Sequence, residues 1–118
     1  MAIFSVQKVV PVTVPDGSVV EELASPKVGS IQSHSLARIT LPPGVVVKRH
    51  YHKSSEEVYF ITEGEAEISL GNESEQVDQG SIVTIPRLEW HSIKNTGQVP
   101  LVMIVTCCPA WVPEDTFF

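Results

Sequence analysis

The fold of this chain is decided by the stretch GVVVKRHYHKSSEEVYFITEG, which runs from Gly44 to Gly64. Residues two apart in a β-strand project from the same face, so a strand here would aim the imidazoles of His50 and His52 at one point. After a short turn through residues 53–55, the next strand can bring a carboxylate back to that point. Two imidazoles and a carboxylate suit Fe, Mn, Ni, Co or Zn. The stretch therefore predicts a metal site built on two neighbouring strands.

Outside this stretch, the sequence is that of a nearly all-β protein. Turn-forming residues recur every few positions, as in Pro42-Pro43-Gly44 and Gly71-Asn72, and no segment repeats apolar residues at helical spacing. Many short strands at close spacing indicate a sandwich, jelly roll or barrel. The predicted strands are residues 7–14, 18–23, 31–41, 45–50, 57–62, 65–70, 76–77, 81–85, 91–95 and 99–107.

Two spaced patterns in the chain resemble the motifs of the cupin family. The first, G-x5-HxH-x4-E-x6-G, is met in full by Gly44, His50, His52, Glu57 and Gly64. The second, G-x5-PxG-x2-H-x3-N, is met by Gly80, Pro86, His91 and Asn95, and departs only at Leu88, where the family has Gly. Leu88 bears on the loop that leads to the last histidine and removes no ligand.

The resemblance implies both a fold and a ligand set. The expected fold is an all-β double-stranded β-helix, or jelly-roll barrel, formed as one domain by residues 1–118. One divalent metal ion would lie inside the barrel near its open end. Its protein ligands would be His50, His52, Glu57 and His91.

Two adjacent carboxylates, Glu56 and Glu57, are both admissible as the fourth ligand by spacing, and strand alternation distinguishes them. Neighbouring residues of a strand face opposite sides, so only one of the two can reach the barrel interior. The full four-residue spacing from His52 and the six residues to Gly64 favour Glu57. Tyr59 would then also point inward, while Val58 and Phe60 would point outward.

Tyr59 and Arg38 are the candidate catalytic residues. Tyr59 would share the inward face with Glu57, where its phenol could orient a substrate or act as an acid or base; the alternative is a core aromatic whose hydroxyl is satisfied by the protein. Arg38 lies in the middle of a predicted strand, and a buried guanidinium there would clamp a carboxylate or phosphate in a bidentate manner. The alternative for Arg38 is exposure to solvent.

Composition and charge limit the possible partners and location. The 118 residues suit one domain, and the net charge of −6 repels phosphate backbones, which argues against nucleic acid. We expect no signal peptide and no membrane span, since the longest apolar runs are too short. Cys107 and Cys108 are the only cysteines and are adjacent, so no disulfide framework is implied and a cytoplasmic location is expected.

The resemblance to cupins implies a metalloenzyme that acts on a small organic molecule, with a dioxygenase-like reaction preferred. Sugar isomerases or lyases of the cupin type and non-catalytic small-ligand-binding cupins are the alternatives. The resemblance also implies a homodimer. Outward-facing Val58, Phe60 and Ile68 would supply an apolar patch for a two-fold partner to cover.

Overall fold

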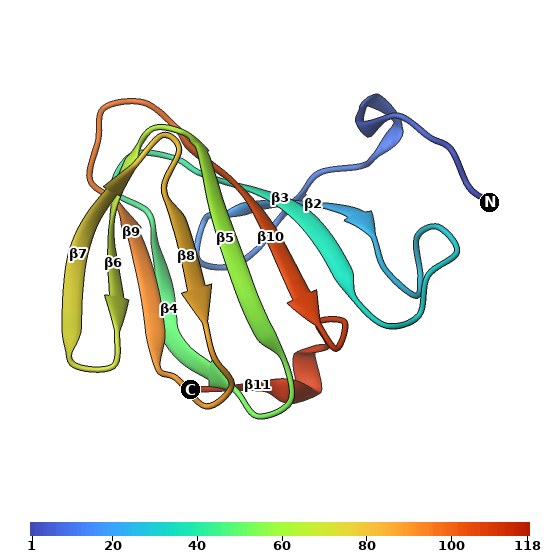
Figure 1. Cartoon of the computed structure of the whole chain (residues 1–118). Helices are drawn as coiled ribbons and strands as arrows, with labels where there is room; N and C mark the ends of the chain where they lie inside the picture. Colours follow the sequence, from blue (N-terminus) through green and yellow to red (C-terminus); the bar gives the residue numbers. More distant parts are fainter.

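Two antiparallel β-sheets form a double-stranded β-helix in a computed structural model that describes residues 1–118 (Figure 1). One sheet has six strands in the order β1-β2-β3-β10-β5-β8, and the other has five in the order β11-β4-β9-β6-β7. The six-stranded sheet consists of β1 (Val12–Thr13), β2 (Val19–Ala24), β3 (Ser35–Leu41), β10 (Leu101–Cys108), β5 (Glu56–Glu63) and β8 (Ile82–Ile85). The five-stranded sheet consists of β11 (Thr116–Phe117), β4 (Val46–His52), β9 (His91–Asn95), β6 (Glu65–Leu70) and β7 (Glu73–Asp78). This is the predicted fold class.

The core lies between the sheets and follows the two-residue period of the strands. In β10, Leu101, Met103, Val105 and Cys107 are buried, and the residues between them are more exposed. Tyr59 and Ile61 of β5 pack on the same face. Removing apolar side chains from water at about 25 cal/mol per Å² is the dominant favourable term in such a core. The alternation therefore fixes which side chains enter the barrel.

The tight turn between β5 and β6 explains the last residue of the first motif. Gly64 has a φ of +87°, and a Cβ atom there would lie 2.8 Å from the carbonyl oxygen of Pro100. Any other residue would suffer both backbone strain and a clash with main chain. Glycine therefore fits this turn, which links strands of opposite sheets.

Most predicted strands are present, with exceptions at the two ends of the chain. The strand expected over residues 7–14 is wrong: a 3-10 turn, η1 (Val6–Lys8), and the two-residue β1 lie there instead. Ser5 caps that turn by accepting a hydrogen bond from the main-chain N–H of Gln7. Near the C-terminus, a second 3-10 turn, η2 (Pro113–Asp115), and β11 were not predicted.

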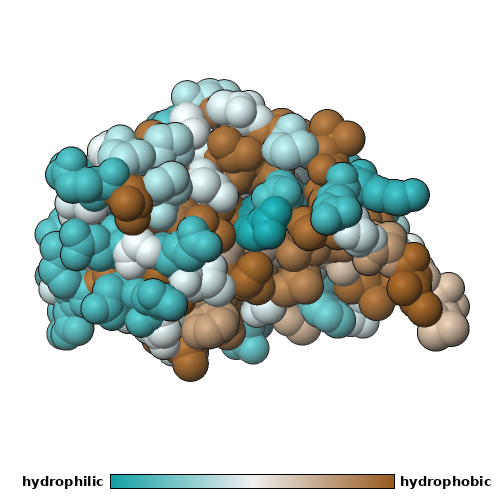
Figure 2. Space-filling view, turned by 90° about the horizontal axis from the view of Figure 1, so that it is seen from above, coloured by the Kyte–Doolittle hydropathy of each residue, from teal (hydrophilic) through white to brown (hydrophobic).

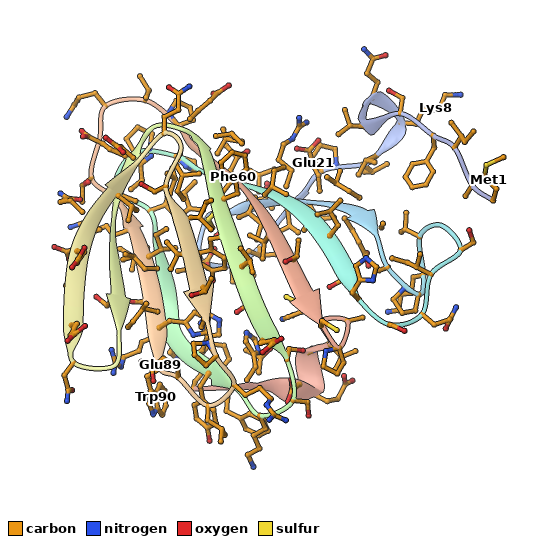
Figure 3. All side chains as sticks on the ribbon, viewed as in Figure 1. Met1, Lys8, Glu21, Phe60, Glu89 and Trp90 are labelled. Carbon is orange, nitrogen blue, oxygen red and sulfur yellow. The ribbon has the colours of Figure 1, made fainter.

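The surface is chemically uneven from one end of the molecule to the other. Hydrophilic side chains gather over the β6–β7 end, and hydrophobic ones gather toward the N-terminal arm (Figure 2). Figure 3 shows that Met1 and Lys8 project away from the sheets, and exposed apolar residues of this arm include Ile3, Phe4 and Val10. None of the helical segments has the length or the apolar character needed to cross a membrane.

The outer face of the six-stranded sheet carries apolar side chains. Val58 and Phe60 point outward as predicted and are 36% and 44% exposed, and Ile82, the partner of Phe60 in β8, is also exposed. Ile68 was expected beside them, and this is wrong. It pairs with Ile93 on the inner face of the five-stranded sheet and is buried in the core.

The homodimer stays a prediction, which this outer face and the apolar arm support. Phe60→Asp should shift sedimentation equilibrium of the protein at micromolar concentration from dimer to monomer, because a charge would be buried in the contact. Gln79→Asp, which adds the same charge at an exposed turn, should leave the dimer intact. A wild-type protein that sediments only as a monomer would contradict the prediction.

The loop before His91 holds its conformation despite the Leu in the second motif. Leu88 has a φ of +69°, in the left-handed region, and its main-chain N–H donates to the carbonyl of His52 at 2.7 Å. A bulky residue pays about 1–2 kcal/mol for such a conformation. Because the side chain is 61% exposed, its packing contributes little stabilisation to offset that strain.

Leu88→Gly should therefore raise the free energy of unfolding. The gain should be about 0.5–1 kcal/mol, since the greater freedom of Gly in the unfolded chain offsets part of the relieved strain. Chemical denaturation measures it. Leu88→Ala is the matched control, because it truncates the same side chain but keeps the Cβ atom, and equal stability of the two variants would refute the strain argument.

Candidate metal centre

Strand β4 delivers the two histidines of the first motif to the barrel interior. The pairing of β4 with β9 shifts by one residue between Val47 and His50, after which His50 lies opposite His91. This irregularity lets Val47 pack on the core while His50 and His52, two residues apart, both face inward. His50 is 8% exposed and His52 is 3% exposed.

Glu57 faces the histidines from the opposite sheet. It lies on β5, is 6% exposed, and shares the inward face with Tyr59 and Ile61, whereas Glu56 is exposed. The inward direction predicted for Glu57 and the outward direction predicted for Glu56 are thus confirmed.

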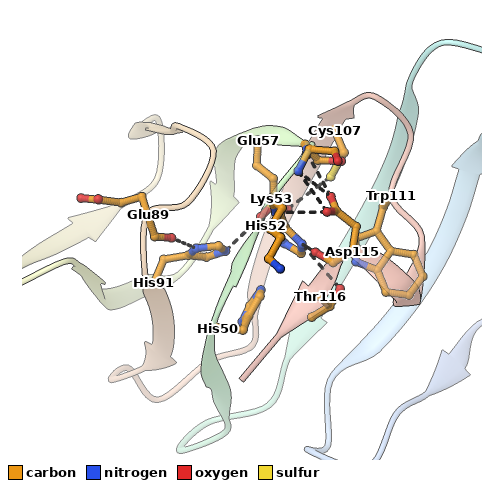
Figure 4. A network of polar contacts seen from close by, with 12 residues as sticks. His50, His52, Lys53, Glu57, Glu89, His91, Cys107, Trp111, Asp115 and Thr116 are labelled. Carbon is orange, nitrogen blue, oxygen red and sulfur yellow. Dashed lines mark hydrogen bonds and ion pairs between the residues drawn. The ribbon is translucent and has the colours of Figure 1, made fainter.

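His91 completes the group from the first residue of β9. Its side chain is buried, and the candidate ligand atoms of His50, His52, Glu57 and His91 all lie within 4.8 Å of one another. The residues come from β4, β5 and β9, so both sheets must pack correctly for the group to form. Figure 4 shows the three imidazoles and the carboxylate gathered at one place.

Each of the three imidazoles is oriented by a main-chain carbonyl. Nδ1 of His50 donates to the carbonyl of Lys48 at 2.7 Å, and Nδ1 of His91 donates to the carbonyl of Glu89 at 2.8 Å. Nδ1 of His52 donates to the carbonyl of Asp115 at 3.0 Å. Because a carbonyl oxygen can only accept, the neutral imidazoles carry their hydrogen on Nδ1 and present a lone pair on Nε2.

The atoms that converge lack hydrogen-bond partners. Nε2 of His52 and Nε2 of His91 each lie 2.9 Å from Oε1 of Glu57, and these three buried atoms have no hydrogen-bond partner. In the neutral imidazoles, all three are acceptors, so the contacts are repulsive unless positive charge lies among them. Protons or a metal ion can supply that charge. Buried neutral imidazoles and a carboxylate are also the donors that bind Fe, Mn, Ni, Co or Zn, so the residues fit a divalent ion.

The charges of the group shift its titration in the directions expected of such a site. Burial raises the pKa of Glu57, but the contacts of Oε1 with His52 and His91, whose imidazoles can donate from Nε2 once protonated, outweigh it and bring this pKa to about 2. Burial lowers the pKa of His52, yet the contact with Glu57 prevails and raises it. For His50, burial dominates and lowers the pKa. Glu57 is therefore a carboxylate at neutral pH.

Comparison with known proteins agrees with this geometry. A family model described as "Cupin domain" matches residues 37–107. The chain belongs to the cupin family. An uncharacterized protein of Methanocaldococcus jannaschii, MJ1618, is 37% identical over 109 residues, which cover 92% of this chain and 87% of that protein.

Solved structures with the same fold cover nearly the whole cupin chain. A predicted oxalate decarboxylase from Thermotoga maritima has a TM-score of 0.80 and 25% identity, and the match covers 92% of this chain and 99% of that one. KdgF from Halomonas sp. has a TM-score of 0.83 at 15% identity, with 97% of each chain covered, a similarity that concerns the fold.

The C-terminal segment of this cupin supports the site in a way that the sequence did not reveal. The carboxylate of Asp115 accepts from the main-chain N–H groups of Lys53, Ser54 and Ser55 at 3.0–3.2 Å, which fixes the turn between β4 and β5 (Figure 4). The carbonyl of Asp115 orients His52. No spacing or composition signal marks Asp115, because its partners lie about 60 residues earlier in the chain.

Tyr59 lies inside the cupin barrel beside the four candidate ligands His50, His52, Glu57 and His91. Its ring centroid is 6.2 Å from that of His91, and burial, followed by the nearby Glu57, raises the pKa of its phenol well above the usual value. The phenol thus keeps its proton at neutral pH. The catalytic role of Tyr59 stays a prediction.

The structure places Arg38 away from the site, which corrects the expectation of a catalytic Arg38. It pairs with Ile104 of β10, between the inward-facing Met103 and Val105, so it lies on the outer face of the sheet. There it holds Glu21 with two hydrogen bonds of 2.8 and 2.9 Å, and its side chain is 37% exposed. The bidentate clamp exists, but its carboxylate belongs to the protein.

Metal affinity should fall as the pH falls, because protons compete for the same lone pairs. The raised pKa of His52 places the first loss of affinity above the ordinary histidine range, whereas the lowered pKa of His50 keeps that residue neutral to lower pH. Metal content after dialysis against chelator at stepwise lower pH checks this. Full retention at mildly acidic pH would contradict the ligand set.

Proposed function

We propose that this cupin is a metal-dependent enzyme that acts on a small organic molecule. The observation that carries the proposal is that three Nε2 atoms and Oε1 of Glu57 converge inside the barrel. Three of these four atoms, those of His52, Glu57 and His91, have no hydrogen-bond partner. Three imidazoles and one carboxylate fill four positions, and a five- or six-coordinate ion would keep one or two open. An open position distinguishes catalytic or ligand-binding ions from structural ones.

Residues around His50 support a route by which a ligand would reach the open position on the ion. His50 is the most exposed of the four candidate ligands, and its Nε2 is not among the fully buried atoms, so a ligand would enter beside it. Phe118 lies next to His50, with ring centroids 6.0 Å apart. The ammonium group of Lys48 lies 4.7 Å from the Phe118 ring, which puts a positive charge at this entrance.

Tyr59 is the residue that we propose to meet the substrate inside the barrel. Its protonated hydroxyl can donate a hydrogen bond to a bound oxygen atom or supply a proton during bond cleavage. The surrounding core side chains, such as Ile61, Ile85 and Met103, exclude water and limit the substrate to a small molecule. A bound ion would supply Lewis-acid or redox chemistry.

Among the reactions open to such a site, we propose an oxygenase first. The ligand set suits redox-active Fe or Mn, and one ion per chain is expected. A lyase or decarboxylase is the second candidate, which the 25% identity to a predicted oxalate decarboxylase favours, together with the proton on Tyr59. Two free cysteines and no disulfide support a reducing compartment such as the cytoplasm.

The experiment that tests the proposal compares two adjacent carboxylates. Wild type loaded with Fe²⁺ or Mn²⁺ is screened for oxygen uptake with small organic acids, for release of CO₂ from oxalate, and for isomerisation or elimination of acidic sugars. Glu57→Gln should lose at least 100-fold of the activity found, because the ion loses its one charged ligand. Glu56→Gln should keep the activity, because that side chain is exposed and faces away.

Two results would count against Glu57 as a ligand, and a third would count against catalysis. Equal loss in both variants, or loss in Glu56→Gln alone, would refute the assignment of Glu57. Metal-loaded wild type that binds small acids without converting any of them would favour a non-catalytic binding protein.

A further inference from the structure

The two carboxylate oxygens of Glu57 have different surroundings. Oε1 lies 2.9 Å from Nε2 of His52 and 2.9 Å from Nε2 of His91, on the side of the candidate metal site. Oε2 accepts a hydrogen bond from the thiol of Cys107, with 3.3 Å between Sγ and Oε2. The two oxygens are therefore already divided between a metal-facing position and a protein-facing position.

The contact between Cys107 and Glu57 is set by the fold. Strands β10 and β5 are neighbours in the six-stranded sheet, and their register places Cys107 directly opposite Glu57. Both side chains face the interior, and Cys107 is 3% exposed. Side chains directly opposite on neighbouring antiparallel strands have Cβ atoms about 4.5–5.5 Å apart, so the thiol is held within reach of the carboxylate.

The direction of the hydrogen bond follows from the chemistry of the two groups. A carboxylate only accepts, and a thiol donates its one hydrogen. The thiol is the only group within the chain that donates to Oε2. A weak donor suffices here, because a buried acceptor with no partner would cost about 1–3 kcal/mol.

We propose that Cys107 is a positioning residue that holds Glu57 as a one-oxygen ligand and so preserves an open position on the ion. A free carboxylate can bind a metal through one oxygen or through both. A hydrogen bond to Oε2 opposes the second mode, which would occupy one more position. This inference rests on the proposed metal site, and Cys107 lies outside both cupin motifs.

Neighbouring Cys108 provides a matched control. It is exposed and its Sγ lies 3.5 Å from the carbonyl of Ser33, so it carries the same functional group without the contact to Glu57. Cys107→Ala and Cys107→Val both remove the donor but change the volume in different ways. Cys107→Ser keeps a donor.

The test loads each protein with Co²⁺, whose visible absorption intensity and EPR spectrum report coordination number without reference to activity. Cys107→Ala and Cys107→Val should both show a higher coordination number than wild type, seen as weaker visible absorption. Cys107→Ser should restore the wild-type spectrum, and Cys108→Ala should match wild type throughout.

Several outcomes would overturn the inference, and they differ from failure of the metal site. Unchanged spectra in both donor-free variants would refute a positioning role. A thiolate-to-cobalt charge-transfer band in wild type that disappears in Cys107→Ala would make Cys107 a ligand instead. A wild-type protein that binds no Co²⁺ would overturn the proposed metal site itself.

Discussion

The constraint on which the structure depends is that hydrogen-bond acceptors lie close together inside the barrel with no donor between them. Nε2 of His52 and Nε2 of His91 both lie 2.9 Å from Oε1 of Glu57, in an interior where water cannot separate them. Such an arrangement is costly for a protein without positive charge at its centre, because buried polar atoms without partners lose their hydration and gain nothing. A divalent ion turns the same arrangement into a stabilising one.

The rest of the molecule holds these atoms in place. Main-chain carbonyls of Lys48, Glu89 and Asp115 orient the three imidazoles, and the thiol of Cys107 orients the carboxylate. Because β4 and β9 belong to one sheet and β5 to the other, the site also couples the two halves of the barrel. The C-terminal strand β11 takes part in this coupling, since it pairs with β4 beside His52 and follows the residue that fixes the β4–β5 turn.

The sequence predicted the parts of this site that depend on local geometry. Strand alternation was enough to place His50 and His52 on one face and to limit the inward carboxylate to one of Glu56 and Glu57, since the period of a strand is fixed by its backbone. The spacing of the family motif then favoured Glu57. It failed where a residue's neighbours come from distant segments. Arg38 meets Glu21, Ile68 faces the core, and Cys107 lies opposite Glu57 because of strand pairings that no local pattern specifies. The contacts of Asp115 could not be predicted for the same reason.

The central claim is that one divalent ion sits among these four side chains. Anomalous diffraction from crystals of the protein, recorded on either side of the absorption edge of the metal found by X-ray fluorescence, tests it most directly. The account predicts one anomalous peak per chain, about 2.0–2.2 Å from three Nε2 atoms and from Oε1 of Glu57. A fully loaded protein with its peak elsewhere, or with no peak among these residues, would contradict it.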